Sequence, residues 1–364
     1  MQIAAFRSRP HAEDESPALI TWRSIAPPLA AATALLLAIA AFAVSWGAAD
    51  IDPRTTLAVL IDHLPFVSTS GFTATEDAII WQVRAPRVAL AGLVGATLAF
   101  AGASYQAVFR NPLAEPYLLG VAAGASLGAT LIIISPLAVT AGVLSPLPPA
   151  AFAGALAAVA LAYGLARAGR TVTPATLILS GVAVSSLATS AVTYLMLKYS
   201  ERTLAVLTWV LGGFNTARWV EAGILLPYLA VAAVIVIVHA RVLNVLQLDE
   251  DQARQLGVNV ERVKLLVLAA ASLATAAAVA VSGLIGFVGL VVPHVVRMIW
   301  GPDYRRVLPL SALLGASFLI LADLVARSVD AGRETPIGVV TAFIGAPFFL
   351  FLLRRYSAPA FERV

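Results

Sequence analysis

Cysteine and charge are what this sequence has least of. None of its 364 residues is a cysteine, which excludes disulfides, thiolate zinc sites, iron–sulfur clusters and a cysteine nucleophile in this chain. Charged residues make up 12% of the positions and hydrophobic residues 60%, and the mean hydropathy is +0.89. Soluble domains of this size do not have such a composition, so the chain is predicted to be an integral membrane protein.

Signatures of nucleotide and nucleic-acid binding are also missing. No stretch matches G-x-x-x-x-G-K-[ST], and neither lysine, Lys198 or Lys264, follows a glycine. The net charge of +4 is small for the length and indicates orientation in a membrane, with no nucleic-acid partner. No carboxylate–histidine cluster or zinc-type spacing suggests an enzyme or a metal site. If ATP drives this protein, ATP and magnesium are expected on a separate chain, with no cofactor on this one.

Ten apolar runs are candidate membrane spans, because about 20 helical residues at roughly 1.5 Å each cross a bilayer core of about 30 Å. They cover residues 27–49, 88–108, 117–134, 147–166, 174–196, 222–239, 265–281, 285–299, 307–326 and 337–353. The first run is too long for a signal peptide and is predicted to be an uncleaved span.

Loop charges predict the orientation of these spans. An even number of spans puts both termini on one side, and if that side is the cytoplasm, sixteen of the 24 lysines and arginines lie in cytoplasmic segments. The predicted organisation is a cytoplasmic segment 1–26, one transmembrane domain 27–356 with a cytoplasmic loop 241–264, and a cytoplasmic tail 357–364. Residues 50–86 are turn-rich and are expected to form a loop that can carry a short helix.

The stretch 84–120 is the one around which the other spans can be placed. No residue from Val88 to Val108 carries a formal charge, which predicts a membrane helix. Ala91, Gly95 and Ala99 recur every fourth residue, so one stripe of this helix is nearly bare and predicts close approach of a neighbouring helix.

The exit of that helix reads RNPLAEP, in which two prolines predict a stiff, shaped connector. Together with the preceding RxPR and the later segment GFVGLVVPHVVR, it resembles the permease subunit of the FecCD type, found in bacterial ABC importers of iron–siderophores, heme and vitamin B12. The resemblance runs from about residue 27 to the C-terminus. It implies an all-α integral membrane protein with the type II ABC importer permease fold and about ten spans.

The same resemblance implies the function and the partners. The expected function is ATP-driven uptake of a bulky metal chelate, an iron–siderophore or heme, across the bacterial inner membrane, with cobalamin as the alternative cargo. The expected partners are a second copy of this chain, two ATP-binding subunits and a substrate-binding protein that is periplasmic or lipid-anchored.

Three arginines are candidates for docking the binding protein. Arg84 and Arg87 match RxPR, and Arg327 ends the sequence DLVAR. Their plain interpretation is interfacial snorkelling. In the family, arginines at these positions face outward and pair with glutamates of the binding protein, for which the planar guanidinium fork is suited.

The loop 241–264 is predicted to couple the permease to the ATPase. Asp249 can cap a short helix with Gln252 three residues on, and Gly257 can end it in a left-handed conformation. Ala253 and Leu256 share a face that could sit in a groove on a partner. A solvated loop is the alternative, and the resemblance to the family's coupling helices favours the coupling role.

The segment from Ser282 to Pro309 holds the second family motif. Gly283, Gly286 and Gly289 recur every third residue, which predicts a brief outer helix, a turn and a shortened span. His294 could suggest a heme ligand, but a histidine in this position is more often a buried, hydrogen-bonded side chain.

An inner gate is predicted at Asn111 and Leu113, because Pro112 and Pro116 present them in a fixed direction. In a two-fold dimer each would meet its own copy near the axis, Leu113 by apolar contact and Asn111 by a hydrogen bond. The resemblance adds a second layer at Val172 and Thr173. The sequence departs from the family there, since Pro174 and Ala175 replace small hydroxyl residues. A merely structural turn is the alternative.

An ion-coupled secondary transporter is the alternative from another class. That mechanism usually places ionisable residues at mid-membrane. The predicted spans are almost free of acids, and the few present, such as Glu221 and Asp323, lie near span ends.

Overall fold

The computed structural model describes residues 22–47, 49–136, 145–168, 172–247, 250–255, 257–329 and 334–357, and all regular structure in these ranges is helical. Seven helical stretches are long and apolar enough to cross a bilayer. They contain α1 (Trp22–Ser45), α4 (Ala85–Phe109), α6 (Leu147–Arg167), α7 (Pro174–Lys198), α9 (Trp219–Val238), α12 (Val260–Ser282) and α14 (Tyr304–Ala326). The other apolar helices are α5 (Val121–Ile134), α13 (Val288–Trp300) and α15 (Ile337–Ser357). The ten coincide with the ten predicted spans, which confirms the predicted all-α class.

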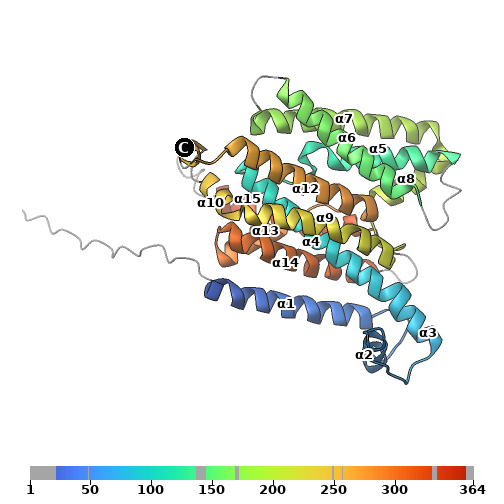
Figure 1. Ribbon diagram of the computed structural model, residues 1–364. Coiled ribbons are helices and arrows are strands. Elements are labelled where there is room, and N and C mark those ends of the chain that lie inside the picture. The colour runs from blue at the N-terminus through green and yellow to red at the C-terminus, as the bar shows by residue number, and fades with distance from the viewer. Residues whose placement is uncertain are drawn as a thin grey trace, which may run out of the picture.

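These helices lie side by side and form one bundle (Figure 1). Short helices cluster at its ends, among them α10 (Ala240–Leu246) at one end and α8 (Thr203–Val210) at the other. We call the end with α10 the inner end and the end with α8 the outer end, after the predicted orientation. In this sense α1 begins and α15 ends at the inner end.

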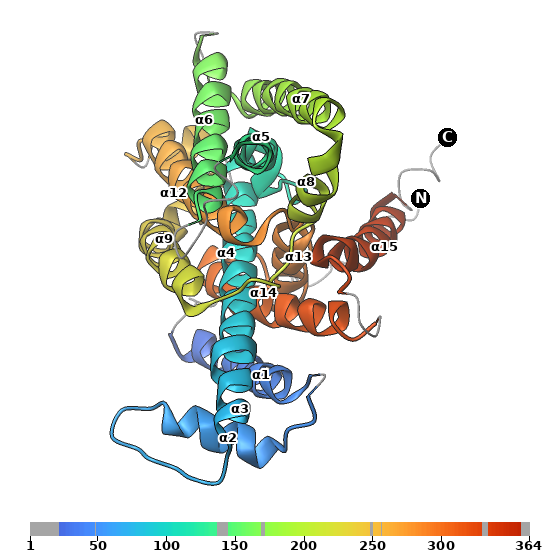
Figure 2. The ribbon, with the colours of Figure 1, turned by 90° about the vertical axis from the view of Figure 1, so that its right-hand side faces the viewer.

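Helix α4 is the centre of the bundle, as Figure 2 shows in the view along the helices. Every residue from Val94 to Phe109 is buried, and α4 packs against α9, α12, α13 and α14. A Cβ built on Gly95 would lie 2.2 Å from the carbonyl oxygen of Gly315 in α14. The predicted close approach along the bare stripe is therefore confirmed, and α14 is the helix that uses it.

The residues before α4 differ from the prediction. Residues 50–86 form α2 (Pro53–Asp62), α3 (Ala74–Asp77) and a π-helix (Ala78–Arg84) that runs directly into α4. A capping box begins this continuous helix, because the Thr73 hydroxyl accepts from the Glu76 N–H and Glu76 accepts from the Thr73 N–H. The continuous helix that contains the RxPR motif thus starts at Ala74, eleven residues before Ala85. Both arginines of the motif lie within this helix and not at its beginning.

Two short helices begin near the middle of the bundle. α5 has 14 residues and α13 has 13, which at about 1.5 Å each is too short for the whole bilayer core. A Cβ on Gly289, in the first turn of α13, would lie 2.8 Å from the Leu98 oxygen in mid-α4 and 2.9 Å from Pro116 Cδ. The connector after α4 therefore folds back into the bundle before α5 starts.

The elbow 283–287 that precedes α13 is bound to this connector. The Tyr117 hydroxyl donates to Ile285 O at 2.9 Å and accepts from Ile285 N at 3.2 Å, and the Glu115 carboxylate accepts from the Phe287 N–H. The predicted brief outer helix is wrong, because Ser282 to Phe287 turn through left-handed conformations at Gly283 and Phe287. The predicted shortened span is confirmed.

Candidate functional site

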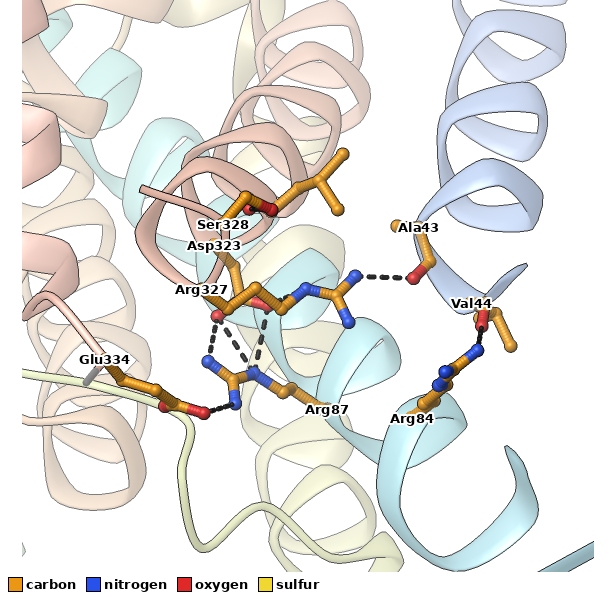
Figure 3. A network of polar contacts seen from close by, with 9 residues as sticks. Ala43, Val44, Arg84, Arg87, Asp323, Arg327, Ser328 and Glu334 are labelled. Atoms are coloured by element: carbon orange, nitrogen blue, oxygen red, sulfur yellow. Dashed lines mark hydrogen bonds and ion pairs between the residues drawn. The ribbon is translucent and has the colours of Figure 1, made fainter. Parts of the chain in front are cut away.

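A network of charged side chains lies at the outer end, where α4, α14 and the segment before α15 meet (Figure 3). The Arg87 guanidinium donates from Nε and Nη2 to the Asp323 carboxylate at 2.8–3.1 Å. Its Nη1 donates to Glu334 Oε1 at 2.8 Å. The Asp323 side chain is 2% exposed and the Glu334 side chain 39%. One carboxylate is thus sealed inside the bundle and the other borders solvent.

Arg84 and Arg327 turn toward the end of α1. Arg84 is 4% exposed and donates to the carbonyl oxygens of Val44, Ser45 and Ala49. Arg327 donates to Ala43 O. Carbonyls at a helix C-terminus lack partners within the helix, so the two arginines supply donors and positive charge to that end. This capping has no signal in the sequence, because about forty residues separate Arg84 from its acceptors.

The structure therefore brings the three predicted docking arginines together. Contrary to the expectation of outward-facing side chains, each guanidinium is held by groups of its own subunit. Sequence reasoning missed Glu334 completely, and it set Asp323 aside as an acid near a span end.

A cavity of about 1600 Å³ opens beside this network. Its walls include the beginning of α6, one side of α8, the first turns of α9 and the end of α12. Arg87 and Glu334 both line it. The network is consequently within reach of a group that enters the cavity from the outer end.

The predicted gate lies in the connector at the inner end of α4. Arg110 ends α4 in the left-handed region at φ +49°, and the Asn111 Oδ1 accepts from the Leu113 N–H at 2.9 Å. Asn111 is exposed in this turn, and Leu113 is 43% exposed. In the second layer, Thr173 caps α7 and is exposed, whereas Val172 packs against the core.

The predicted coupling loop begins with α10 and continues into α11 (Glu250–Gln255). Gly257 has φ +79°, its N–H donates to Arg254 O, and the Val258 N–H donates to Ala253 O. The left-handed helix end predicted for Gly257 is therefore confirmed. Ala253 is fully buried within this subunit, so it supports the loop's own fold and is not offered to a partner. Asp249, Leu256 and the Gln252 side chain lie outside the described residues.

Helix α10 is bonded to two parts of the bundle at once. Gln247 Nε2 donates to Ala107 O at 3.0 Å, in the last turn of α4 before the connector. Asn244 donates to Asp303 Oδ1 at 2.9 Å and accepts from the Tyr304 N–H at 2.8 Å, at the start of α14. Burial alone would raise the pKa of Asp303, but hydrogen bonds from Arg305 and Asn244 outweigh it and hold that pKa below its usual value.

The second family motif contributes to packing between α13 and α4. Gln106 Nε2 donates to Gly289 O at 3.1 Å and its Oε1 accepts from Arg297. His294 is buried with its ring edge toward Phe348. Within the described ranges, no three histidine, aspartate or glutamate residues come together as a metal site would require.

The sequence and the bundle are similar to known transport proteins. The FecCD transport family matches residues 35–355. The cobalamin import system permease protein BtuC of Halobacterium salinarum is 41% identical over 346 residues, which cover 92% of either chain. The hemin transport system permease protein HmuU of Yersinia pestis is 41% identical over 300 residues, which cover 78% of this chain and 86% of HmuU.

A solved structure has the same fold. It is the inward-facing conformation of a metal-chelate type ABC transporter, with a TM-score of 0.77 and 31% sequence identity. The match covers 91% of this chain and 99% of that one. The similarity thus extends over nearly the whole chain.

Proposed function

This chain belongs to the FecCD transport family of ABC importer permeases, and from that premise we propose that two copies of it form the membrane pathway through which a bulky metal chelate enters the cell. The subunit is a multi-pass membrane protein and not itself an enzyme. In the proposed complex two ATP-binding subunits bind ATP and magnesium at the inner end, and a substrate-binding protein delivers the cargo at the outer end. Both termini face the cytoplasm.

The observation that carries this proposal is the position of α10. The hydrogen bond from Gln247 to Ala107 O ties the predicted coupling loop to the last turn of α4. The connector with Asn111 and Leu113 starts three residues later. A displacement of the loop by the ATP-binding subunit can therefore be transmitted directly to the gate through the last turn of α4.

The gate itself is proposed at Asn111 and Leu113, with Thr173 in the second layer. The exposure of Asn111 and Leu113 at the inner end supports contact with a second copy. Cysteines placed singly at 111 and 113 test it, because the native chain has none. We expect a disulfide between subunits in at least one nucleotide state, and failure in every trapped state would place the gate elsewhere.

The cargo is proposed from the relatives. Cobalamin and hemin are both large organic ligands that already enclose their metal, so a shared apolar pathway can carry either class. We propose a metal chelate, with cobalamin as plausible as an iron–siderophore or heme. Direct binding of cyanocobalamin, hemin and a ferric hydroxamate to the cognate substrate-binding protein would separate them.

Uptake into proteoliposomes tests the mechanism. With the ATP-binding subunits present, we expect uptake that requires ATP, stops when ATP hydrolysis is disabled, and continues when the proton gradient is abolished. The last condition matters because the connector carries Glu115 back into the bundle, where an ion-coupled transporter would place an acid. Uptake driven by an ion gradient without ATP would overturn the proposal.

Docking of the binding protein on Arg84, Arg87 and Arg327 also remains a proposal. The three arginines and the two acids Asp323 and Glu334 leave the cluster with one excess positive charge. That excess favours an acidic partner. However, the Arg87 guanidinium already donates to Asp323 from Nε and Nη2 and to Glu334 from Nη1, so a carboxylate of the partner would have to compete with these acids.

A further inference from the structure

Glu334 is the replaceable partner of Arg87. The Arg87 fork uses Nε and Nη2 for Asp323 and leaves Nη1 for Glu334. Asp323 is bidentate and almost fully buried, whereas Glu334 makes one bond and is more than a third exposed. A bidentate, buried pair is the stronger of the two, and an exposed single contact is worth little in water. An incoming carboxylate would therefore exchange with Glu334 and not with Asp323.

The outer cavity provides the approach for such an exchange. Arg87 and Glu334 both line it, and Figure 3 shows Glu334 on the side of Arg87 away from α1. If Glu334 leaves, the cluster keeps three arginines and one buried acid. Its excess of positive charge then rises by one, which strengthens attraction to an arriving carboxylate.

Glu334 also belongs to a segment that holds the outer end together. The Thr335 N–H donates to Ala326 O at the end of α14. The N–H groups of Ile337 and Gly338 donate to Gly212 O and Leu211 O, just after α8. Thr335 thus bonds the segment 334–336 to α14, and the first residues of α15 bond to the residues after α8. The ion pair of Glu334 with Arg87 bonds the same segment to α4.

We propose that Glu334 is an internal competitor for docking: a carboxylate of the substrate-binding protein displaces it from Arg87 Nη1, and this displacement frees the segment 334–336 at the outer mouth. This inference rests on the docking role proposed above. Docking then has a built-in consequence for α14 and α15, since the segment that precedes α15 and bonds to α14 loses its bond to α4 when the binding protein is in place.

The first test is affinity. Removing the competitor with Glu334→Gln should tighten binding of the cognate binding protein by about fivefold, the size expected for loss of a partly exposed ion pair. Glu334→Ala should give at least as large a gain. Glu201→Gln is the matched control, because Glu201 lines the same cavity but takes no part in the described contacts of Arg87, and should change affinity little.

The second test follows the segment itself. A single cysteine at position 335 (Thr335→Cys) should react faster with a maleimide when the binding protein is present, in the complex reconstituted with its ATP-binding subunits. The competitor role of Glu334 is overturned if Glu334→Gln binds the binding protein with unchanged or lower affinity and the maleimide labelling at position 335 does not change on docking. The double variant Arg87→Gln/Asp323→Asn separates the docking role of Arg87 from the competitor role of Glu334. If it binds the binding protein normally, the docking role of Arg87 is wrong. If it binds weakly, the docking role stands, whatever the result for Glu334.

Discussion

The ion pair between Arg87 and Asp323 gives the sharpest prediction about stability. Replacing Asp323 with leucine fills a similar volume but removes three hydrogen bonds from Arg87, which stays buried. Leaving one member of a buried pair alone typically costs about 3–5 kcal/mol. Because Glu334 still contacts Nη1, we expect the lower end, about 3 kcal/mol.

The double variant Arg87→Leu/Asp323→Leu should recover most of that loss. Replacing a whole buried pair with apolar side chains of similar volume is often neutral, since no charge is left without a partner. We therefore expect the double variant within about 1 kcal/mol of the native chain. The coupling energy should be at least about 2 kcal/mol, because the loss caused by Arg87→Leu alone adds to the difference between Asp323→Leu and the double variant. Asp323→Leu should therefore be less stable than both the double variant and the native chain.

The free energy of unfolding can be followed by SDS titration in mixed micelles, using the fluorescence of the six tryptophans. The single variant Arg87→Leu completes the cycle. It leaves Asp323 buried, with Arg327 Nε 3.9 Å away as its remaining ion-pair partner among the described residues. A double variant as unstable as Asp323→Leu, or a coupling energy below about 0.5 kcal/mol, would refute the assignment of this pair as a buried unit.

Further predictions concern packing, coupling and pH. Gly95→Ala should sharply reduce the yield of folded protein in size-exclusion profiles, because its Cβ would lie 2.2 Å from the α14 backbone, whereas Gly164→Ala, with nothing within 4 Å, should not. Gly257→Val should lower ATP-driven uptake more than Gly257→Asn, because the left-handed φ of +79° strains a β-branched residue while asparagine tolerates it; equal uptake by both contradicts the coupling role. The contact of Asp303 with Asn244 should be complete above the ordinary carboxyl pKa of 3.8 and be lost as the pH falls through the lower folded value. Hydrogen exchange in α10 should then rise at low pH, and Asp303→Asn should weaken that dependence.

Much of the fold could be read from the sequence because the bilayer restricts the choices. Each span must be apolar and must bond its backbone internally, so ten apolar runs predicted ten helices with ends within about five residues. The bare stripe around Gly95 predicted a close helix contact for the same local reason. The sequence did not indicate which helix fills the stripe, because α14 lies more than two hundred residues away in the chain.

Errors arose where the backbone leaves regular spans. The elbow 283–287 was predicted to be partly helical from its glycines, but it bends through left-handed residues whose geometry depends on Tyr117 and Glu115 from the connector. Ala253 was placed on a partner-facing surface because helical periodicity alone cannot tell which face of a short helix turns toward its own bundle.

By itself the sequence determined the membrane class, the number of spans and the motifs that place the chain in its family, since each depends on composition or on residues close together along the chain. Only the tertiary structure decided the partners of the charged groups. Arg84 with the end of α1, Arg87 with Asp323 and Glu334, and Gln247 with Ala107 are contacts between segments far apart in sequence. A buried charge takes whichever counter-charge or carbonyl the packing of helices brings within about 3 Å, and that proximity is fixed by the whole bundle.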